Sequence, residues 1–169
     1  ALERAGIQPE AVDEVLMGNV LQAGQGQAPA RQAALGAGLP KNVPCTTVHK
    51  VCGSGMKTAM MGFDMLKAGS ANVVVAGGQE SMTNAPYLLL KGRSGYRYGN
   101  DRIFDHMALD GLEDAYEHTP MGVFAEQCVD KYGFTREEQD DYAIESLRRA
   151  REATEKGLFE WEITPVTVK

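Results

Sequence analysis

The sequence lacks several features that identify whole classes of protein. Its 169 residues contain no apolar run of about 18 residues, so no transmembrane helix is expected, and the N-terminal residues do not have the basic-then-apolar pattern of a signal peptide. Only three cysteines and three histidines are present, and their spacing fits no zinc site. We therefore expect a protein of the reducing cytoplasm that holds no metal and does not associate with a membrane.

Positive charge is also scarce. Seventeen Lys and Arg stand against 23 Asp and Glu, and the net charge of -6 argues against a nucleic-acid binder. Apolar residues make up 43% of the chain and charged residues 24%, a composition that excludes disorder, collagen-like repeats and coiled coil. The composition therefore indicates a soluble globular protein of one domain, or of one domain with an appendage.

Apolar periodicity in the first half predicts alternating strands and helices. The predicted strands cover Val12–Val20, Val43–Val51 and Asn72–Ala76, and the last, a Val-Val-Val-Ala run, is expected to be buried on both faces of a parallel sheet. The predicted helices cover residues 30–37 and 54–68. The second helix carries four methionines, which are expected to fill the core: Met56, Met60, Met61 and Met65.

The second half differs in character. Residues 81–111 are rich in Gly, Tyr and basic side chains and are predicted to leave the sheet, with the basic residues in a solvated loop. Two helices and a strand are predicted after them: residues 121–131, 135–156 and 163–168. Thr135 and Glu138 fit a capping box at the start of the second helix.

The most informative local feature is a cysteine between a predicted strand and a predicted helix. Cys52 is followed by Gly53-Ser54-Gly55, which opens the helix. The unpaired N–H groups and the positive dipole end of a helix N-terminus stabilise a thiolate. Glycine at this point allows a substrate carbonyl to approach backbone N–H groups that stabilise an oxyanion. The pattern is typical of an acyl-transfer nucleophile.

Two plainer interpretations stand beside this one. A single cysteine before a helix is often a small buried hydrophobe. A glycine-rich turn can also bind a phosphate, but Gly53-Ser54-Gly55 lacks both the GxGxxG spacing and the lysine-and-hydroxyl ending of a P-loop.

The other cysteines and histidines are assigned structural or solvent-facing places. Cys45 and Cys128 lack neighbouring glycines, and Cys128 is expected in the core. His49 lies three residues before Cys52, on the opposite face of an extended segment, so it is expected to be packed or solvated and not to act as a base. His106 is expected to face solvent.

The wider sequence resembles the thiolase family, which exchanges acyl groups between coenzyme A thioesters. The similarity is carried by residues 48–60 and by residues 72–87, which include Gly-Gly-Gln-Glu-Ser-Met. Residues 18–34, 121–126 and 136–143 extend it over essentially the whole chain. A ketoacyl synthase also places a cysteine before a helix, but the Gly-Gly-Gln-Glu-Ser-Met string resembles thiolase instead.

The resemblance implies an α/β, thiolase-like fold that is only partly present. Residues 1–80 correspond to a partial N-terminal thiolase domain, a mixed sheet with a buried helix that lacks its first strand. Residues 81–169 correspond to an α-rich loop domain, and the C-terminal thiolase domain is absent. Residues 1–5, followed by Gly6, are interpreted as the last turn of a helix. We expect such a piece to expose apolar surface.

The resemblance also implies roles for individual residues. Cys52 is the acyl-accepting nucleophile, and the Cys52-Gly53 turn contributes to the oxyanion hole. Met121 corresponds to a substrate-binding methionine, although Pro120 stands where the biosynthetic members carry His, and His118 lies two residues earlier. An acyl-CoA thioester is the substrate, no cofactor is implied, and the full-length parent is expected to be a cytoplasmic homodimer or homotetramer.

Family chemistry needs three further motifs, Gly-His-Pro, Cys-x-Gly-Gly-Gly and Asn-Glu-Ala-Phe, and none occurs in residues 1–169. The predicted parent activity is condensation of two acetyl-CoA to acetoacetyl-CoA or the reverse thiolysis, and this chain alone is expected to be inactive. One alternative is a 3-ketoacyl-CoA thiolase of fatty-acid β-oxidation. Another is a non-catalytic, thiolase-like binding or assembly module.

Overall fold

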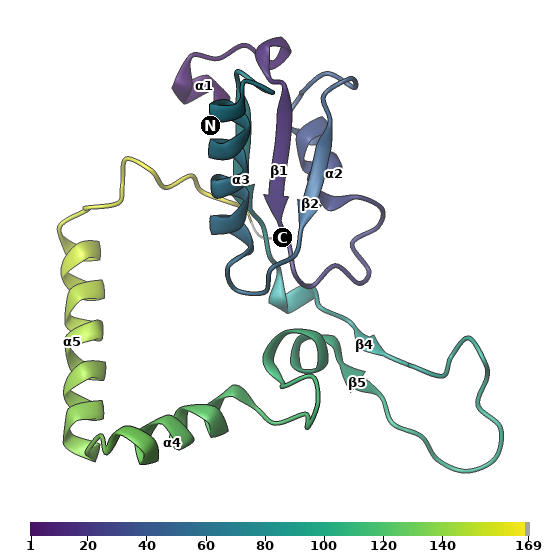
Figure 1. Cartoon of the computed structure of the whole chain (residues 1–169), viewed down its shortest axis with the longest axis vertical. Helices are drawn as coiled ribbons and strands as arrows, with labels where there is room; N and C mark the ends of the chain where they lie inside the picture. The colour runs from purple at the N-terminus through teal and green to yellow at the C-terminus, as the bar shows by residue number, and fades with distance from the viewer. Residues whose placement is uncertain (168–169) are drawn as a thin grey trace. The chain divides into compact units, whose positions relative to one another are not determined.

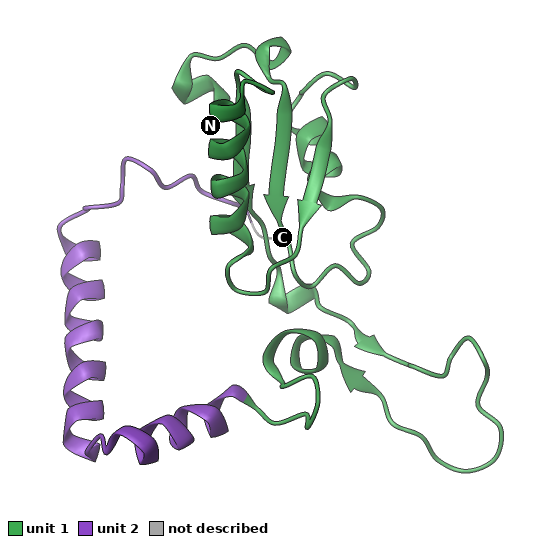
Figure 2. Ribbon diagram, in the orientation of Figure 1, with its two compact units in different colours: residues 1–120 green, residues 121–169 purple. Residues whose placement is uncertain are grey.

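The chain is divided into two compact units, Ala1–Pro120 and Met121–Lys169 (Figure 2). The structure is a computed structural model that describes residues 1–167. Each unit is described by itself below. The division predicted from the sequence, residues 1–80 and 81–169, stays a prediction, because compactness alone does not define a domain.

A three-stranded parallel sheet organises the first unit (Figure 1). Its strands are β1 (Glu14–Gly18), β2 (Cys45–Val48) and β3 (Val74–Gly78). β1 lies in the centre, where Val15 is paired with Cys45 on one side and with Val75 on the other. The three predicted strands are therefore confirmed, β1 and β2 within shorter spans and β3 two residues later than predicted, and the parallel sheet expected for the last of them is confirmed.

Two helices connect these strands. α2 (Pro29–Gly36) leads from β1 to β2, and α3 (Ser54–Ala68) leads from β2 across to β3. The two crossovers run in opposite directions along the sheet, and parallel crossovers are right-handed, so the helices cover opposite faces (Figure 1). Before the sheet, α1 (Leu2–Ala5) ends at Gly6 in the left-handed conformation, as predicted, and a 3-10 turn, η1, covers Pro9–Ala11.

The main core lies under α2. It consists of buried aliphatic residues from the sheet, the helix and their connections: Val12, Val15, Ala34, Leu39 and Val43. Burial of an aliphatic side chain contributes about 1.5–3 kcal/mol relative to exposure. This side of the sheet therefore supplies most of the hydrophobic stabilisation of the first unit.

α3 packs on the sheet through small side chains. Thr58 and Gly62 are buried on the helix face that contacts β1 and β3. A Cβ at Gly62 would lie 3.2 Å from Cγ1 of Val74, and a Cβ at Gly18 would lie 2.6 Å from the carbonyl carbon of Ser54. The helix and sheet backbones therefore approach more closely than larger residues would permit.

The large apolar residues of α3 lie on its other face. Met56 is 74% exposed and Phe63 is 59% exposed, and Met60 and Leu66 are exposed as well. The prediction that the helix methionines fill the core is wrong for Met56 and Met60, because the small-residue face occupies the sheet. The predicted exposure of apolar surface is confirmed.

β3 is less buried than its all-apolar sequence predicts. Val74 and Val75 are half-buried and Ala76 is exposed, so burial on both faces is wrong. The physical reason is position, since β3 is an edge strand. Its start is held by Asp13, whose carboxylate accepts the N–H groups of Asn72 and Val73, and these bonds lower the pKa of Asp13 below its usual range.

The predicted departure from the sheet after residue 80 is confirmed. A 3-10 turn, η2 (Met82–Asn84), leads into an antiparallel pair, β4 (Tyr87–Leu88) and β5 (Phe104–Asp105), and a π-helical turn, η3, covers Ala108–Leu112. The loop 89–103 between the paired strands is exposed throughout, as expected for its basic residues.

The described part of the second unit, residues 121–167, contains two helices. α4 covers Met121–Tyr132 and α5 covers Arg136–Glu155, close to the predicted bounds, and the capping box at the start of α5 is confirmed. Cys128 is exposed, so its predicted burial is wrong. α4 buries no residue. Residues 163–167 form no strand, contrary to prediction, and Val168 lies outside the described residues.

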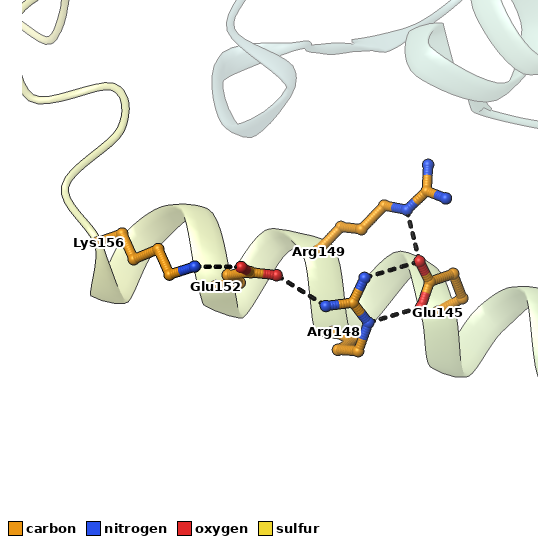
Figure 3. A network of polar contacts seen from close by, with 5 residues as sticks. All are labelled: Glu145, Arg148, Arg149, Glu152 and Lys156. Atoms are coloured by element: carbon orange, nitrogen blue, oxygen red, sulfur yellow. Dashed lines mark hydrogen bonds and ion pairs between the residues drawn. The ribbon is translucent and has the colours of Figure 1, made fainter.

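α5 carries a chain of ion pairs along its surface (Figure 3). Glu145 accepts two bonds from the guanidinium of Arg148, at 2.6 and 2.9 Å, and a third from Nε of Arg149 at 2.7 Å. Arg148 also donates to Glu152, which pairs with Lys156. Arg148, and then Arg149, lower the pKa of Glu145 to about 2.

We expect the pKa of Glu145 to rise toward its usual range when Arg148 is replaced by Gln, because the largest stabilisation of the carboxylate is removed. In the parent chain the pairs stabilise α5 above pH 4.5, and this contribution is lost as the pH falls from 4.5 toward about 2. The pKa is measured by NMR titration of the side-chain carboxyl. Arg136→Gln, which removes a pair with Asp140 only, is the control. Equal effects of the two variants would contradict the network.

We expect Gly18→Ala to lower the free energy of unfolding by about 1–3 kcal/mol, because the added methyl group meets the backbone of Ser54 and Gly55. The matched control is Gly36→Ala in α2, where a Cβ meets no atom within 4 Å and alanine favours helix by about 0.5–1 kcal/mol. Urea denaturation measures both changes. A Gly18→Ala variant as stable as the parent would exclude the close approach of α3 to β1.

Candidate active site

The segment between β2 and α3 is a tight turn in a strained conformation. α3 begins at Ser54 with Gly53 as its N-cap, so Cys52 lies directly before the helix N-terminus, as predicted. Val51, the residue before the cysteine, has φ 45°. A β-branched residue in the left-handed region is a steric outlier that costs about 1–3 kcal/mol. Such outliers persist only where surrounding contacts hold them.

Hydrogen bonds to two side chains hold this turn. The Ser54 hydroxyl donates to the carbonyl oxygen of Val51 at 2.6 Å and accepts the N–H of Lys50 at 2.8 Å. His49 is exposed, and its Nδ1 accepts the N–H of Val51 at 3.3 Å. The imidazole is therefore solvated, as predicted, and accepts a bond from the turn backbone through Nδ1. That His49 does not act as a base for Cys52 stays a prediction.

A pocket of about 430 Å³ opens beside Cys52. It lies where the carboxyl ends of β1 and β3, at Gly18 and Gly78, meet the first residues of α3. In parallel α/β sheets, ligands bind outside the carboxyl ends of the strands, where successive crossovers diverge. Apolar side chains supply much of the rest of the wall: Val20, Leu21, Val51, Met82, Met107 and Leu112.

One side of the pocket is shaped by a carboxylate in the loop after β3. Glu80 accepts the side-chain Nδ2 of Asn19 at 2.9 Å and the backbone N–H groups of Val20 and Leu21 at 2.9 and 3.0 Å. Asn19 is fully buried and also donates to the carbonyl oxygen of Gln79. These bonds join the loops that follow β1 and β3. Sequence analysis missed both residues, and the only local signal is a Glu directly after a Gly-rich strand end.

A histidine ties a third loop to this region. His106 is 6% exposed, its Nδ1 lies 2.6 Å from Oδ2 of Asp110, and its Nε2 accepts the N–H of Ala23 at 3.4 Å. The prediction that His106 faces solvent is wrong, because its partner Ala23 lies 83 residues away and cannot be inferred from neighbours. This contact holds the start of the turn that carries Met107 and Leu112 to the pocket wall.

The predicted site residues fall into two groups. Cys52 is exposed at the pocket, and Gly53 lies beside it as the helix N-cap. Met121 begins α4 in the second unit and is 49% exposed. Within residues 1–167, no cluster of three or more His, Cys, Asp or Glu is suited to hold a metal ion, and no helix there is long and apolar enough to span a bilayer.

Comparisons with known proteins place the chain in context. Residues 1–169 match the family described as thiolase, N-terminal domain. Acetyl-CoA acetyltransferase 2 of Arabidopsis thaliana is 54% identical over 99% of this chain, and acetyl-CoA acetyltransferase of Schizosaccharomyces pombe is 53% identical over 99%. The chain covers 42% of each of these relatives. A crystal structure of Acat5 thiolase from Ascaris suum in complex with coenzyme A superposes with a TM-score of 0.94 at 43% identity, over 99% of this chain and 44% of that one.

We expect Glu80→Gln to lower the free energy of unfolding by about 1–2 kcal/mol, because one acceptor oxygen becomes an N–H₂ group that faces N–H donors. Glu14→Gln is the matched control, since Glu14 accepts one hydroxyl bond from exposed Thr46, and its effect should stay within about 0.5 kcal/mol. Urea denaturation compares the two. Equal stability of both variants would rule out the Glu80 carboxylate as the link between these loops.

Proposed function

The chain belongs to the thiolase family, and from this premise we propose that it carries the acyl-accepting part of a thiolase site, with Cys52 as the nucleophile. The observation that carries the proposal is the position of Cys52, directly before the N-terminus of the 15-residue helix α3 and in the wall of the pocket. Cys45 is half-buried away from such a helix start, and Cys128 lies within α4.

The proposed step is the transfer of an acetyl group from coenzyme A to Cys52. Sγ of Cys52 attacks the thioester carbonyl carbon, a bond forms between them, and the bond from that carbon to the sulfur of coenzyme A breaks. The proton that Cys52 loses ends on the released coenzyme A thiol. The product is a thioester on the protein, which a second acyl-CoA or free coenzyme A consumes in the condensing or the thiolytic direction.

The turn supplies electrostatic stabilisation for this step. The attack creates an oxyanion, which the backbone N–H of Cys52 and the positive dipole end of α3 are proposed to stabilise. The N–H of Gly53 donates to the carbonyl oxygen of Lys50 at 3.1 Å and is released only if this bond opens. One oxyanion donor typically contributes about 2.7–4 kcal/mol to the barrier of an acyl transfer. Gly53 presents no side chain that would obstruct the approaching carbonyl.

The composition of the pocket supports a small acyl group as the part that is recognised there. Its wall beyond the turn is mostly aliphatic and thioether side chains, which favour an acetyl or short acyl group over a charged one. Acetyl-CoA and acetoacetyl-CoA are therefore the proposed substrates, in agreement with the names of the relatives. The proposal extends to Met121 as a substrate contact, to a parent without a resident cofactor, and to a homodimeric or homotetrameric parent.

We expect acetyl-CoA to acetylate Cys52 selectively, at a rate about tenfold above that of Cys128, because only Cys52 lies at a helix N-terminus. Peptide mass spectrometry locates the added acetyl group, and its loss on treatment with hydroxylamine identifies a thioester. Cys52→Ser should abolish the label, and Cys128→Ser should leave it unchanged. We expect no turnover of acetoacetyl-CoA, since the three further motifs of family chemistry do not occur in the chain.

Three results would count against parts of this proposal. Equal or absent acetylation of the three cysteines would favour the non-catalytic binding or assembly module. Measurable cleavage of acetoacetyl-CoA by the chain would contradict its expected inactivity while leaving the nucleophile in place. A preference for long-chain acyl-CoA over acetyl-CoA in the labelling reaction would favour a thiolase of fatty-acid β-oxidation.

A further inference from the structure

A buried hydroxyl makes two of the three side-chain hydrogen bonds that hold the strained turn before Cys52, and the exposed imidazole of His49 makes the third. The Ser54 hydroxyl contacts backbone groups on both sides of Val51, accepting the N–H of Lys50 and donating to the carbonyl oxygen of Val51. The same carbonyl oxygen accepts the backbone N–H of Ser54 at 3.1 Å. Ser54 thus holds the peptide group that follows Val51 and the His49–Lys50 peptide group, while the Lys50–Val51 peptide group between them is bonded to His49 and Gly53.

Ser54 is itself held in place by the sheet. It is 5% exposed, and its backbone packs against Gly18 at the end of β1, where a Cβ would lie 2.6 Å from the Ser54 carbonyl carbon. Close packing against Gly18 therefore fixes the backbone position from which the Ser54 hydroxyl projects. The hydroxyl and the backbone N–H of Ser54 therefore connect the contact between α3 and the sheet to the turn.

We propose that Ser54 is a positioning residue: its hydroxyl latches Val51 in the left-handed conformation and thereby places Cys52 in the pocket wall. The inference rests on the proposed role of Cys52 as the nucleophile. Without the latch, valine leaves the left-handed region, which L residues with a branched Cβ disfavour. The Val51–Cys52 peptide group then rotates, and both Sγ and the N–H of Cys52 move away from the helix N-terminus.

The first test measures the reactivity of Cys52 and the conformation of Val51 in Ser54→Ala. Iodoacetamide alkylation, followed by peptide mass spectrometry, gives the rate at Cys52 with exposed Cys128 as the internal reference. We expect the rate at Cys52 to fall about tenfold and the rate at Cys128 to stay unchanged. A loss of about tenfold corresponds to the free-energy cost of a strained residue of this kind, which lowers the population of the reactive conformation. In the parent chain, NMR should show the strong intraresidue amide-to-Hα cross-peak of a positive φ at Val51, and this peak should weaken in the variant.

A pair of double variants separates a latch from a general structural role. Glycine adopts positive φ without steric cost, whereas alanine does not. Ser54→Ala with Val51→Gly should recover most of the lost Cys52 reactivity, and Ser54→Ala with Val51→Ala should not. Ser70→Ala removes a hydroxyl bond at the other end of α3 and should leave the Cys52 rate within about twofold of the parent.

Each outcome decides the proposal. If Ser54→Ala does not fold, the two double variants are compared by thermal unfolding, and the latch requires the glycine variant to be the more stable. An unchanged Cys52 rate in Ser54→Ala, equal behaviour of the glycine and alanine variants, or an unreactive Cys52 in the parent would overturn it. None of these measurements uses acyl-CoA. Failure of acetylation alone would therefore refute the proposed function and leave the latch standing.

Discussion

The close approach of α3 to the central strand is the constraint on which the rest of the first unit depends. A Cβ at Gly18 would lie 2.6–2.7 Å from backbone atoms of Ser54 and Gly55, so the helix N-terminus reaches this position only because β1 ends in glycine. Thr58 and Gly62 continue the contact along the helix. Small residues on the sheet side leave the large apolar residues of α3 on its other face, where Met56 and Phe63 are exposed.

The geometry of the candidate site follows from this contact. With the start of α3 fixed against β1, only a short turn remains between β2 and the helix, and the turn closes by placing Val51 at φ 45°. Strain of this kind concentrates at functional sites because the surrounding structure holds it there. Hydrogen bonds to the Glu80 carboxylate join the loops after β1 and β3, and both loops line the pocket beside Cys52.

Much of the fold could be predicted because its signals are local. Thr135 and Glu138 lie three residues apart and form the predicted capping box, and Gly53-Ser54-Gly55 marks the observed start of α3. The errors concern residues whose surroundings come from distant parts of the chain. His106 is buried and bonds to Ala23, which lies 83 residues away in the chain. Cys128 has apolar neighbours in the sequence, but its side chain is exposed in the structure.

The sequence by itself determined the parallel α/β arrangement, the helix bounds and the cysteine at a helix N-terminus, because each follows from spacing over a few residues. Only the tertiary structure decided which face of α3 meets the sheet, that Val51 is left-handed, and that Asn19 and Glu80 bond across 61 residues. The physical reason is that burial and backbone strain depend on what packs against a residue. For this turn, the packing partner is a glycine that lies 36 residues before Ser54 in the chain.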